Sequence, residues 1–189
     1  EARDNLKFIS DEDHALFALQ LAMNLLDNGD NRMAADELID ILPTVESAFG
    51  KDPLYRVGTI VSMAWQLLHA NEYRRSHEVL EKAYQYCVQL PSSLVRDSLV
   101  ARINLLRGKV YLAISGYEQA FQYLQKAMSQ YSTPRSDHDE MYLEIVADLF
   151  MAAEMTGRHV AADDLSFPLL QYLDTCVAEK LPHLREHIS

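Results

Sequence analysis

The chain has 189 residues, 49% of them apolar, and a formal net charge of −11 at pH 7. A chain of this length and apolar content can bury one continuous core, so we expect a single domain over residues 1–189. The negative charge repels phosphate backbones and argues against direct nucleic-acid binding. The sequence has no apolar run long enough for a membrane span, and its first residues do not form a secretion signal.

Two cysteines, Cys87 and Cys176, lie far apart in a chain large enough to fold without disulfide bonds. We therefore expect both to be reduced residues of the core. This use of cysteine favours a cytoplasmic location, with the periplasm as the alternative if a signal sequence was removed.

One pattern recurs four times along the chain. Each copy ends with a small residue, and these residues are Ala34, Ser76, Ala120 and Ala162. They are 42 residues apart from 34 to 76, 44 apart from 76 to 120, and 42 apart from 120 to 162. Apolar residues fall at helical spacing on both sides of a short polar turn in every copy. Each copy therefore predicts an antiparallel helical hairpin, and the fold class expected is all-α.

The repeats predict an α-solenoid of about four such hairpins. Their expected bounds are residues 10–50, 52–91, 93–132 and 136–180, with a C-terminal capping helix over 181–189.

Local signals at the helix ends agree with this division. Asp52-Pro53 places proline at a first helical position, and Ser115 with Glu118 predicts a capping box. Gly29 and Gly157 stand where a helix ends with a left-handed residue.

Further signals are weaker or oppose the helical pattern. Ser10 with Asp13 and Ser136 with Asp139 form weaker capping pairs. Pro43 and Pro168 fall inside otherwise helical segments, so we expect each to kink or end its helix.

The third copy carries a family pattern, formed by Gly108, Tyr111, Gly116, Tyr117, Ala120, Leu124 and Ala127. It resembles the tetratricopeptide repeat (TPR). The long period is similar to the roughly 42-residue variety found in kinesin light chains and in some bacterial signalling proteins, and the resemblance covers about residues 10–180. The fourth copy departs from the pattern, with Phe150 in place of a small residue and Ser166 in place of a large apolar one. The resemblance implies a right-handed superhelix whose concave groove binds peptides or proteins.

The same resemblance implies which residues line that groove: Leu19, Met23, Leu26, Val61, Trp65, Leu68, His69, Arg102, Leu105, Leu106, Lys109, Ala147, Met151 and Met155. The nine candidates for peptide binding are Leu19, Met23, Leu26, Trp65, His69, Arg102, Lys109, Met151 and Met155. Apolar walls would then surround a basic centre, which suits a peptide with apolar anchors. The alternative is that Trp65 and the methionines are ordinary core residues between hairpins.

The function expected is a protein-protein interaction scaffold with a protein or peptide partner and no cofactor. The alternative is a sensory, regulatory or autoinhibitory domain of a larger bacterial signalling protein, such as a transcriptional regulator or a cyclic-nucleotide signalling enzyme. An enzyme is not expected, because the sequence has no phosphate loop and no nucleophile elbow. His183 and His187 lack a third ligand at a known spacing, so no metal site is expected. The sequence leaves open whether the chain forms a homodimer.

Overall fold

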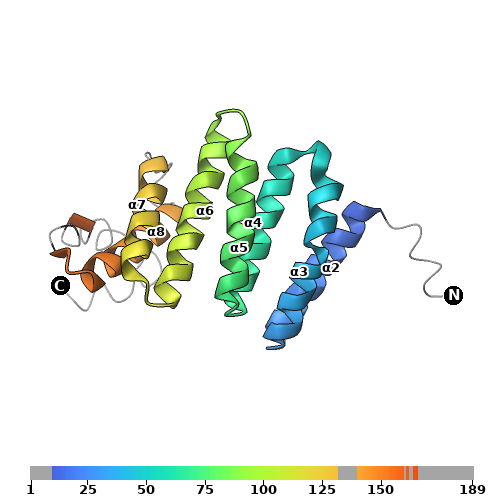
Figure 1. The fold of residues 1–189 in the computed structure, drawn as a ribbon, viewed down its shortest axis with the longest axis horizontal. Helices are drawn as coiled ribbons and strands as arrows, with labels where there is room; N and C mark the ends of the chain where they lie inside the picture. Colours follow the sequence, from blue (N-terminus) through green and yellow to red (C-terminus); the bar gives the residue numbers. More distant parts are fainter. Residues whose placement is uncertain (1–9, 132–139, 160, 162–163, 166–189) are drawn as a thin grey trace, which may run out of the picture. The chain divides into compact units, whose positions relative to one another are not determined.

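The computed structural model describes residues 10–131, 140–159, 161, 164 and 165 (Figure 1). All regular elements in these ranges are helices. They are α2 (Asp11–Asp27), α3 (Asn31–Ala48), the 3-10 helix η2 (Phe49–Lys51), α4 (Pro53–His69), α5 (Tyr73–Val88), α6 (Leu94–Ala113), α7 (Tyr117–Gln130) and α8 (Glu140–Met155). The predicted all-α fold class is therefore confirmed.

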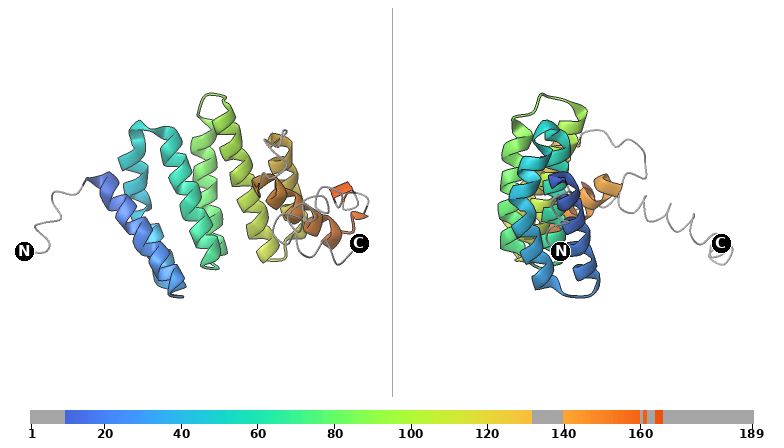
Figure 2. Two further views of the ribbon diagram at one scale, coloured as in Figure 1. Left: turned by 180° about the vertical axis from the view of Figure 1, so that it is seen from behind. Right: turned by 90° about the vertical axis from the view of Figure 1, so that its right-hand side faces the viewer.

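The chain divides into two compact units, Glu1–Leu106 and Arg107–Ser189, with the boundary inside α6. In the first unit, α2 packs on α3 and α4 packs on α5, so each pair forms an antiparallel hairpin (Figures 1 and 2). The first hairpin packs on the second through α3 and α4. In the second unit, α7 packs on α8. Stacked hairpins of this kind are the building principle of an α-solenoid.

A residue with positive φ ends the first helix of each of the four repeats. These residues are Gly29 (82°), Asn71 (61°), Ser115 (61°) and Gly157 (72°). They lie 42 residues apart from 29 to 71, 44 apart from 71 to 115, and 42 apart from 115 to 157, which is the spacing of the sequence repeat.

Each turn is closed by the same backbone hydrogen bond. The amide after the positive-φ residue donates to a carbonyl five residues earlier: Asp30 to Leu25 (2.8 Å), Glu72 to Leu67 (2.9 Å), Gly116 to Tyr111 (2.8 Å) and Arg158 to Ala153 (2.8 Å). This bond and the left-handed residue define the Schellman motif, which satisfies carbonyls that would otherwise lack partners at a helix end. The sequence repeat is therefore a repeat of one turn geometry.

The small residues of the repeat mark where the two helices of a hairpin touch. Ala34, Ser76 and Ala120 are fully buried, and the Ser76 hydroxyl donates to the Ala64 carbonyl of the facing helix at 2.8 Å. A larger side chain at such a position would push the helices apart, because protein interiors are close-packed. Ala162 lies outside the described residues.

Two of the predicted helix starts are confirmed. Pro53 is the first residue of α4, and the Asp52 carboxylate accepts the amide of Tyr55 at 3.0 Å. The Ser10 hydroxyl accepts the amide of Asp13 at 3.1 Å and so caps α2. The pair Ser136 and Asp139 lies outside the described residues.

The capping box predicted for Ser115 with Glu118 is wrong. Ser115 is the positive-φ residue of the turn, so it cannot also precede α7 as the extended cap residue. The residue that precedes α7 is Gly116, and no side chain caps it.

The helix end predicted at Pro43 is also wrong, because α3 runs from Asn31 to Ala48 without interruption. A kink at Pro43 stays a prediction. A proline inside a helix costs about 3 kcal/mol through its missing amide and its ring. Leu42 and Val45 are both buried beside it, and burial of each contributes about 1.5–3 kcal/mol. Their burial therefore offsets the cost of the proline. Pro168, the capping helix 181–189, His183, His187 and Cys176 lie outside the described residues.

Cys87 is fully buried in α5, as predicted for a core residue. Burial raises the pKa of its thiol, and the sulfur donates a long hydrogen bond to the Arg96 carbonyl at 3.7 Å. In the described part of the chain, no helix is long and apolar enough to cross a membrane.

Ion pairs connect α3 and α5 on the surface of the first unit. Arg75 contacts Asp36 at 2.7 Å, and this hydrogen bond raises the pKa of Arg75. Lys82 and the Tyr86 hydroxyl both contact Glu46 at 3.2 Å. Such exposed pairs add little stability each, so the apolar contacts carry most of the packing energy.

Gly108 allows α6 and α7 to approach each other closely. A methyl group on this glycine would lie 2.5 Å from Cγ of Leu124, which is fully buried. Gly58, in the middle of α4, has no atom within 4 Å of the same position. The two helical glycines therefore stand in opposite surroundings.

We predict opposite effects for the two alanine substitutions. Gly108→Ala should lower the free energy of unfolding by about 1–2 kcal/mol, because overpacking exceeds the gain in helix propensity. Gly58→Ala should raise it by up to about 1 kcal/mol, because only the propensity changes. Chemical denaturation of both variants measures the difference. Equal stability of the two variants would contradict the close packing at Leu124.

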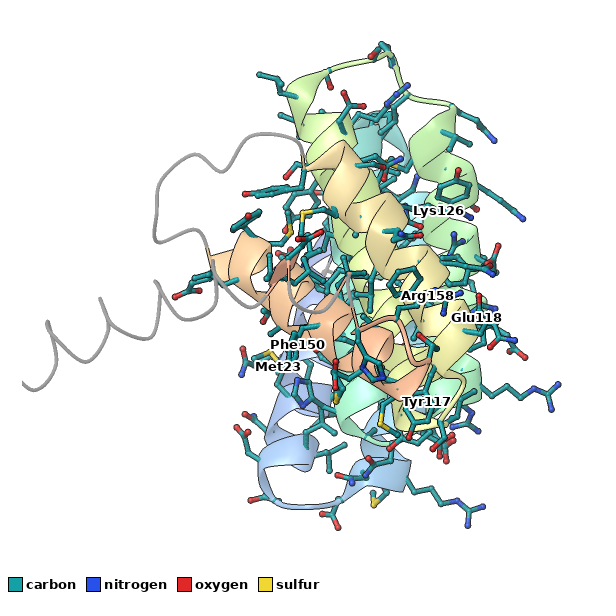
Figure 3. The ribbon with its side chains drawn as sticks, turned by 90° about the vertical axis from the view of Figure 1, so that its left-hand side faces the viewer. Met23, Tyr117, Glu118, Lys126, Phe150 and Arg158 are labelled. Carbon is teal, nitrogen blue, oxygen red and sulfur yellow. The ribbon has the colours of Figure 1, made fainter. Side chains whose placement is uncertain are left out.

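Arg158 and Glu118 join the turn after α8 to the start of α7 (Figure 3). The guanidinium donates to both carboxylate oxygens of Glu118, at 2.9 and 3.0 Å, and lies 4.5 Å from the centre of the Phe121 ring. The hydrogen bonds from Arg158 lower the pKa of Glu118, and the Gln122 amide acts in the same direction.

This lowered pKa gives a prediction about pH. A carboxylate with a lowered folded-state pKa stabilises the fold above its ordinary value, here 4.5, and loses that effect as the pH falls through the folded value. Glu118→Gln should therefore reduce the melting temperature near neutral pH and have a smaller effect in acid. Glu37→Gln, at an exposed position of α3, is the control. A difference that is independent of pH would contradict the assignment.

Candidate functional site

Two adjoining hollows lie between α2 and α4. The first has a volume of about 430 Å³ and is lined by Met23, Leu26, Asp27, Asn31, Trp65, Gln66 and His69. The second has a volume of about 570 Å³ and is lined by Leu16, Leu19, Gln20, Met23, Leu54, Tyr55, Gly58, Thr59, Ser62 and Gln66. Met23 and Gln66 belong to both linings, so the hollows are continuous. We call them together the α2–α4 trough.

The composition of α2 explains one wall of the trough. Residues 14–26 include no Asp, Glu, Lys or Arg, and the buried residues of the helix are only Ala15, Ala18 and Ala22. Because alanines make the contacts to the core, larger apolar side chains remain on the surface. Leu16 and Met23 are examples, and Met23 has 45% of its surface exposed. Apolar groups exposed side by side in a hollow are typical of a binding surface.

The opposite wall is formed by one face of α4. Gly58, Ser62 and Gln66 follow at intervals of four residues, so they lie in one row on the helix. The Ser62 hydroxyl donates to the Gly58 carbonyl at 3.1 Å, which leaves the lone pairs of the hydroxyl oxygen available. Oε1 of Gln66 is covered and has no hydrogen-bond partner in the described part of the chain.

Trp65 lines the first hollow and lies close to two basic side chains. Its ring meets that of His69 edge to face at 4.3 Å, and the Arg102 guanidinium lies 5.8 Å from its centre. Among the described residues, Arg102 has no carboxylate within ion-pair distance. The half-buried tryptophan ring therefore has close to its face a cation that is unpaired in this part of the chain.

The structure brings together several of the predicted groove residues. Met23, Leu26, Trp65 and His69 line one hollow, and Leu19 lines the next. Arg102 reaches the same place through its contact with Trp65. The shared location is an observation, whereas the binding of a peptide by these residues stays a prediction.

Three other groove positions belong to the core. Val61, Leu105 and Leu106 are buried, so placing them in the groove was wrong. Val61 is next to the exposed Ser62, and a shift of one residue turns a helical side chain by about 100°. Leu105 and Leu106 lie in a stretch of α6, residues 96–112, in which no side chain is exposed. The alternative interpretation of Met23 as a core residue is wrong as well, since it is half-exposed.

The remaining candidates lie in the second unit. Lys109 pairs with Asp148 at 2.9 Å, so its charge is already balanced. Met151 and Met155 are exposed on α8, as is Ala147, and none of the three is a core residue.

Much of the α4 wall was not predicted from the sequence. Tyr55, Gly58, Ser62 and Gln66 line the trough but were not among the candidates. The four-residue spacing of Gly58, Ser62 and Gln66 was the signal that could have found them. It was weak because small and amide side chains are common on any solvated helix face.

No group of three His, Cys, Asp or Glu residues within the described ranges could hold a metal ion. The trough itself contains one carboxylate, Asp27, and one imidazole, His69.

Comparisons with known proteins add little to this description. No family model matches the chain, and no curated protein matches it. One similar solved structure is that of a Podospora anserina protein named as a kinesin light chain with nearly identical TPR-like repeats. The alignment has 15% identity and a TM-score of 0.39, and it covers 89% of this chain and 97% of the other. A similarity this low supports no conclusion about function, and the helical repeat rests on the four turns described above.

The exposure of Trp65 gives a direct prediction. It is the only tryptophan of the chain, so fluorescence reports on the trough alone. We expect acrylamide to quench the emission of the folded protein substantially, because the ring is only half-buried. Arg102→Ala should increase the quenching by uncovering one face of the ring. Emission that resists quenching until the protein unfolds would show that Trp65 belongs to the core.

Proposed function

We propose that this chain is a non-catalytic scaffold that binds a peptide or protein segment in the α2–α4 trough. The observation that supports it most is the trough itself, which is lined by the exposed side chain of Met23 and the half-buried ring of Trp65. Its hollows have the volume typical of pockets that enclose ligand groups. Methionine adapts to different partners, and tryptophan and arginine contribute most at protein interfaces.

The chemistry of the trough favours binding over catalysis. The Ser62 hydroxyl donates to a main-chain carbonyl rather than to a base, so it is not arranged as an activated nucleophile. Asp27 and His69 are the ionisable side chains that line it, apart from the phenol of Tyr55. Neither of the two is hydrogen-bonded to a nucleophile in the structure as described.

The proposal also covers the location of the protein, its class of partner and a second contact surface. We place the protein in the cytoplasm, with a protein partner and no direct contact with nucleic acid. The exposed methionines of α8, Met151 and Met155, would add a second apolar contact surface, and Lys109 would contribute through its aliphatic stem. A guest belonging to an output domain of a larger signalling protein would occupy the same trough.

A matched pair of methionines tests the proposal. The probe is a phage-displayed library of random twelve-residue peptides, selected on the intact chain and then titrated while Trp65 fluorescence is recorded. Met23→Ala should weaken the binding of selected peptides about tenfold, as truncation of an interface anchor does. Met33→Ala, at a methionine of α3 that is 60% exposed and outside the trough, should leave it unchanged.

Two results would contradict the proposal. One is a selection that enriches no peptide on the folded chain. The other is selected peptides that lose as much affinity from Met33→Ala as from Met23→Ala, because binding would then occur elsewhere.

A further inference from the structure

Gly58 lacks a structural reason to be glycine. It lies in the middle of α4, where glycine destabilises a helix relative to alanine. At Gly108, by contrast, packing requires glycine, because the Leu124 side chain occupies the space that a methyl group would need. No atom lies within 4 Å of the corresponding position at Gly58, and its φ is not in the left-handed region. Neither packing nor backbone conformation accounts for it.

The position of Gly58 in the trough suggests another reason. Gly58 lines the second hollow, and a side chain there would project into it. Without one, the backbone of α4 is open to a guest, which is a recognised use of glycine where two main chains approach closely.

The row that begins at Gly58 continues with hydrogen-bond acceptors. The Ser62 oxygen has free lone pairs and can accept an amide. Oε1 of Gln66 is covered and without a partner among the described residues, and a rotation of its side chain would let it accept an amide as well. Residues four apart on a helix are about 6 Å apart along its axis. In an extended chain, amides on the same side are two residues, or about 6.6–6.8 Å, apart. The two spacings match.

A helical guest would not use these acceptors, because its amides are bonded within the helix except at its first turn. An extended guest has an amide free at every second residue and turns alternate side chains to opposite sides. Some of its side chains can therefore enter the hollows while its main chain lies over α4.

Charge matching defines the guest further. The second hollow is lined by no Asp, Glu, Lys, Arg or His, although the chain as a whole carries a net charge of −11. A charged side chain of a guest would lose water there without gaining a partner. The lining therefore matches an uncharged segment and selects against a charged one.

We propose that the part of the guest in the second hollow is an extended, uncharged and apolar segment of a partner protein, whose main chain passes over Gly58. This proposal rests on the function proposed above and adds the chemical class of the guest. It also makes Gly58 a residue that determines specificity, by setting how closely the guest main chain approaches α4.

Gly58→Ala separates stability from binding. The variant should be at least as stable as the natural chain, yet bind the selected peptides about tenfold more weakly, because the new methyl group occupies the approach path. Gly50→Ala is the matched control, since Gly50 also has open space around it but lies in η2, outside the trough. It should leave the affinity unchanged.

The peptides themselves provide the second readout. Those selected on the chain should carry uncharged residues over at least three consecutive positions, and N-methylation of single amides in that stretch should weaken binding at alternate positions. Peptides that gain helical circular dichroism on binding would overturn the proposal.

The outcomes distinguish this proposal from the function on which it rests. If Met23→Ala weakens binding and Gly58→Ala does not, the trough binds peptides but their main chain does not pass over Gly58. If neither substitution matters, or no peptide is selected, the proposed function fails as well.

Discussion

The structure depends on one turn, which occurs four times. A left-handed residue ends the first helix of each repeat, and the following amide returns to a carbonyl five residues earlier. This closure leaves only a few residues between helices, so the chain reverses at once. The small residue of each repeat then falls one turn into the next helix, where Ala34, Ser76 and Ala120 are buried against the helix before them. The hairpin, the contact within it and the length of the repeat all follow from this turn.

The trough exists because only a narrow, alanine-lined face of α2 is buried in its hairpin. The buried residues of α2 are alanines, so its leucines and Met23 are not fully buried in the core. On α4 the division is different, since Val57, Ile60 and Leu67 enter the core while a row of small and amide side chains lines the trough. The α2 wall thus supplies mainly apolar surface, and the α4 wall adds hydrogen-bonding groups beside Leu54 and Trp65. A guest that uses both must present apolar side chains and free main-chain amides together.

The sequence predicted what depends on local chemistry. The all-α class, the repeat spacing, the proline start of α4 and the left-handed glycines Gly29 and Gly157 are confirmed. Asn71 and Ser115 adopt the same left-handed conformation, which residue type alone did not indicate. Asparagine adopts this conformation more often than most residues but less often than glycine, and serine carries no such preference.

Predictions that depend on packing were less successful. Pro43 does not end α3, because neighbouring buried side chains outweigh its cost. Leu105 and Leu106 looked like groove residues but are core, since an apolar side chain can serve either and only the rotation of the helix decides. Glycine posed the same difficulty, as Gly58 and Gly108 look alike in sequence and have opposite surroundings.

The methyl NMR spectrum of the chain labelled at its methionine ε-carbons tests the central claim most directly. Seven methionines give seven resonances, and Met23 lies in the trough whereas Met33 lies outside it. Addition of a selected peptide to saturation should shift the Met23 resonance and leave that of Met33 in place. An unchanged Met23 resonance at saturation would show that the trough between α2 and α4 is not where the guest binds.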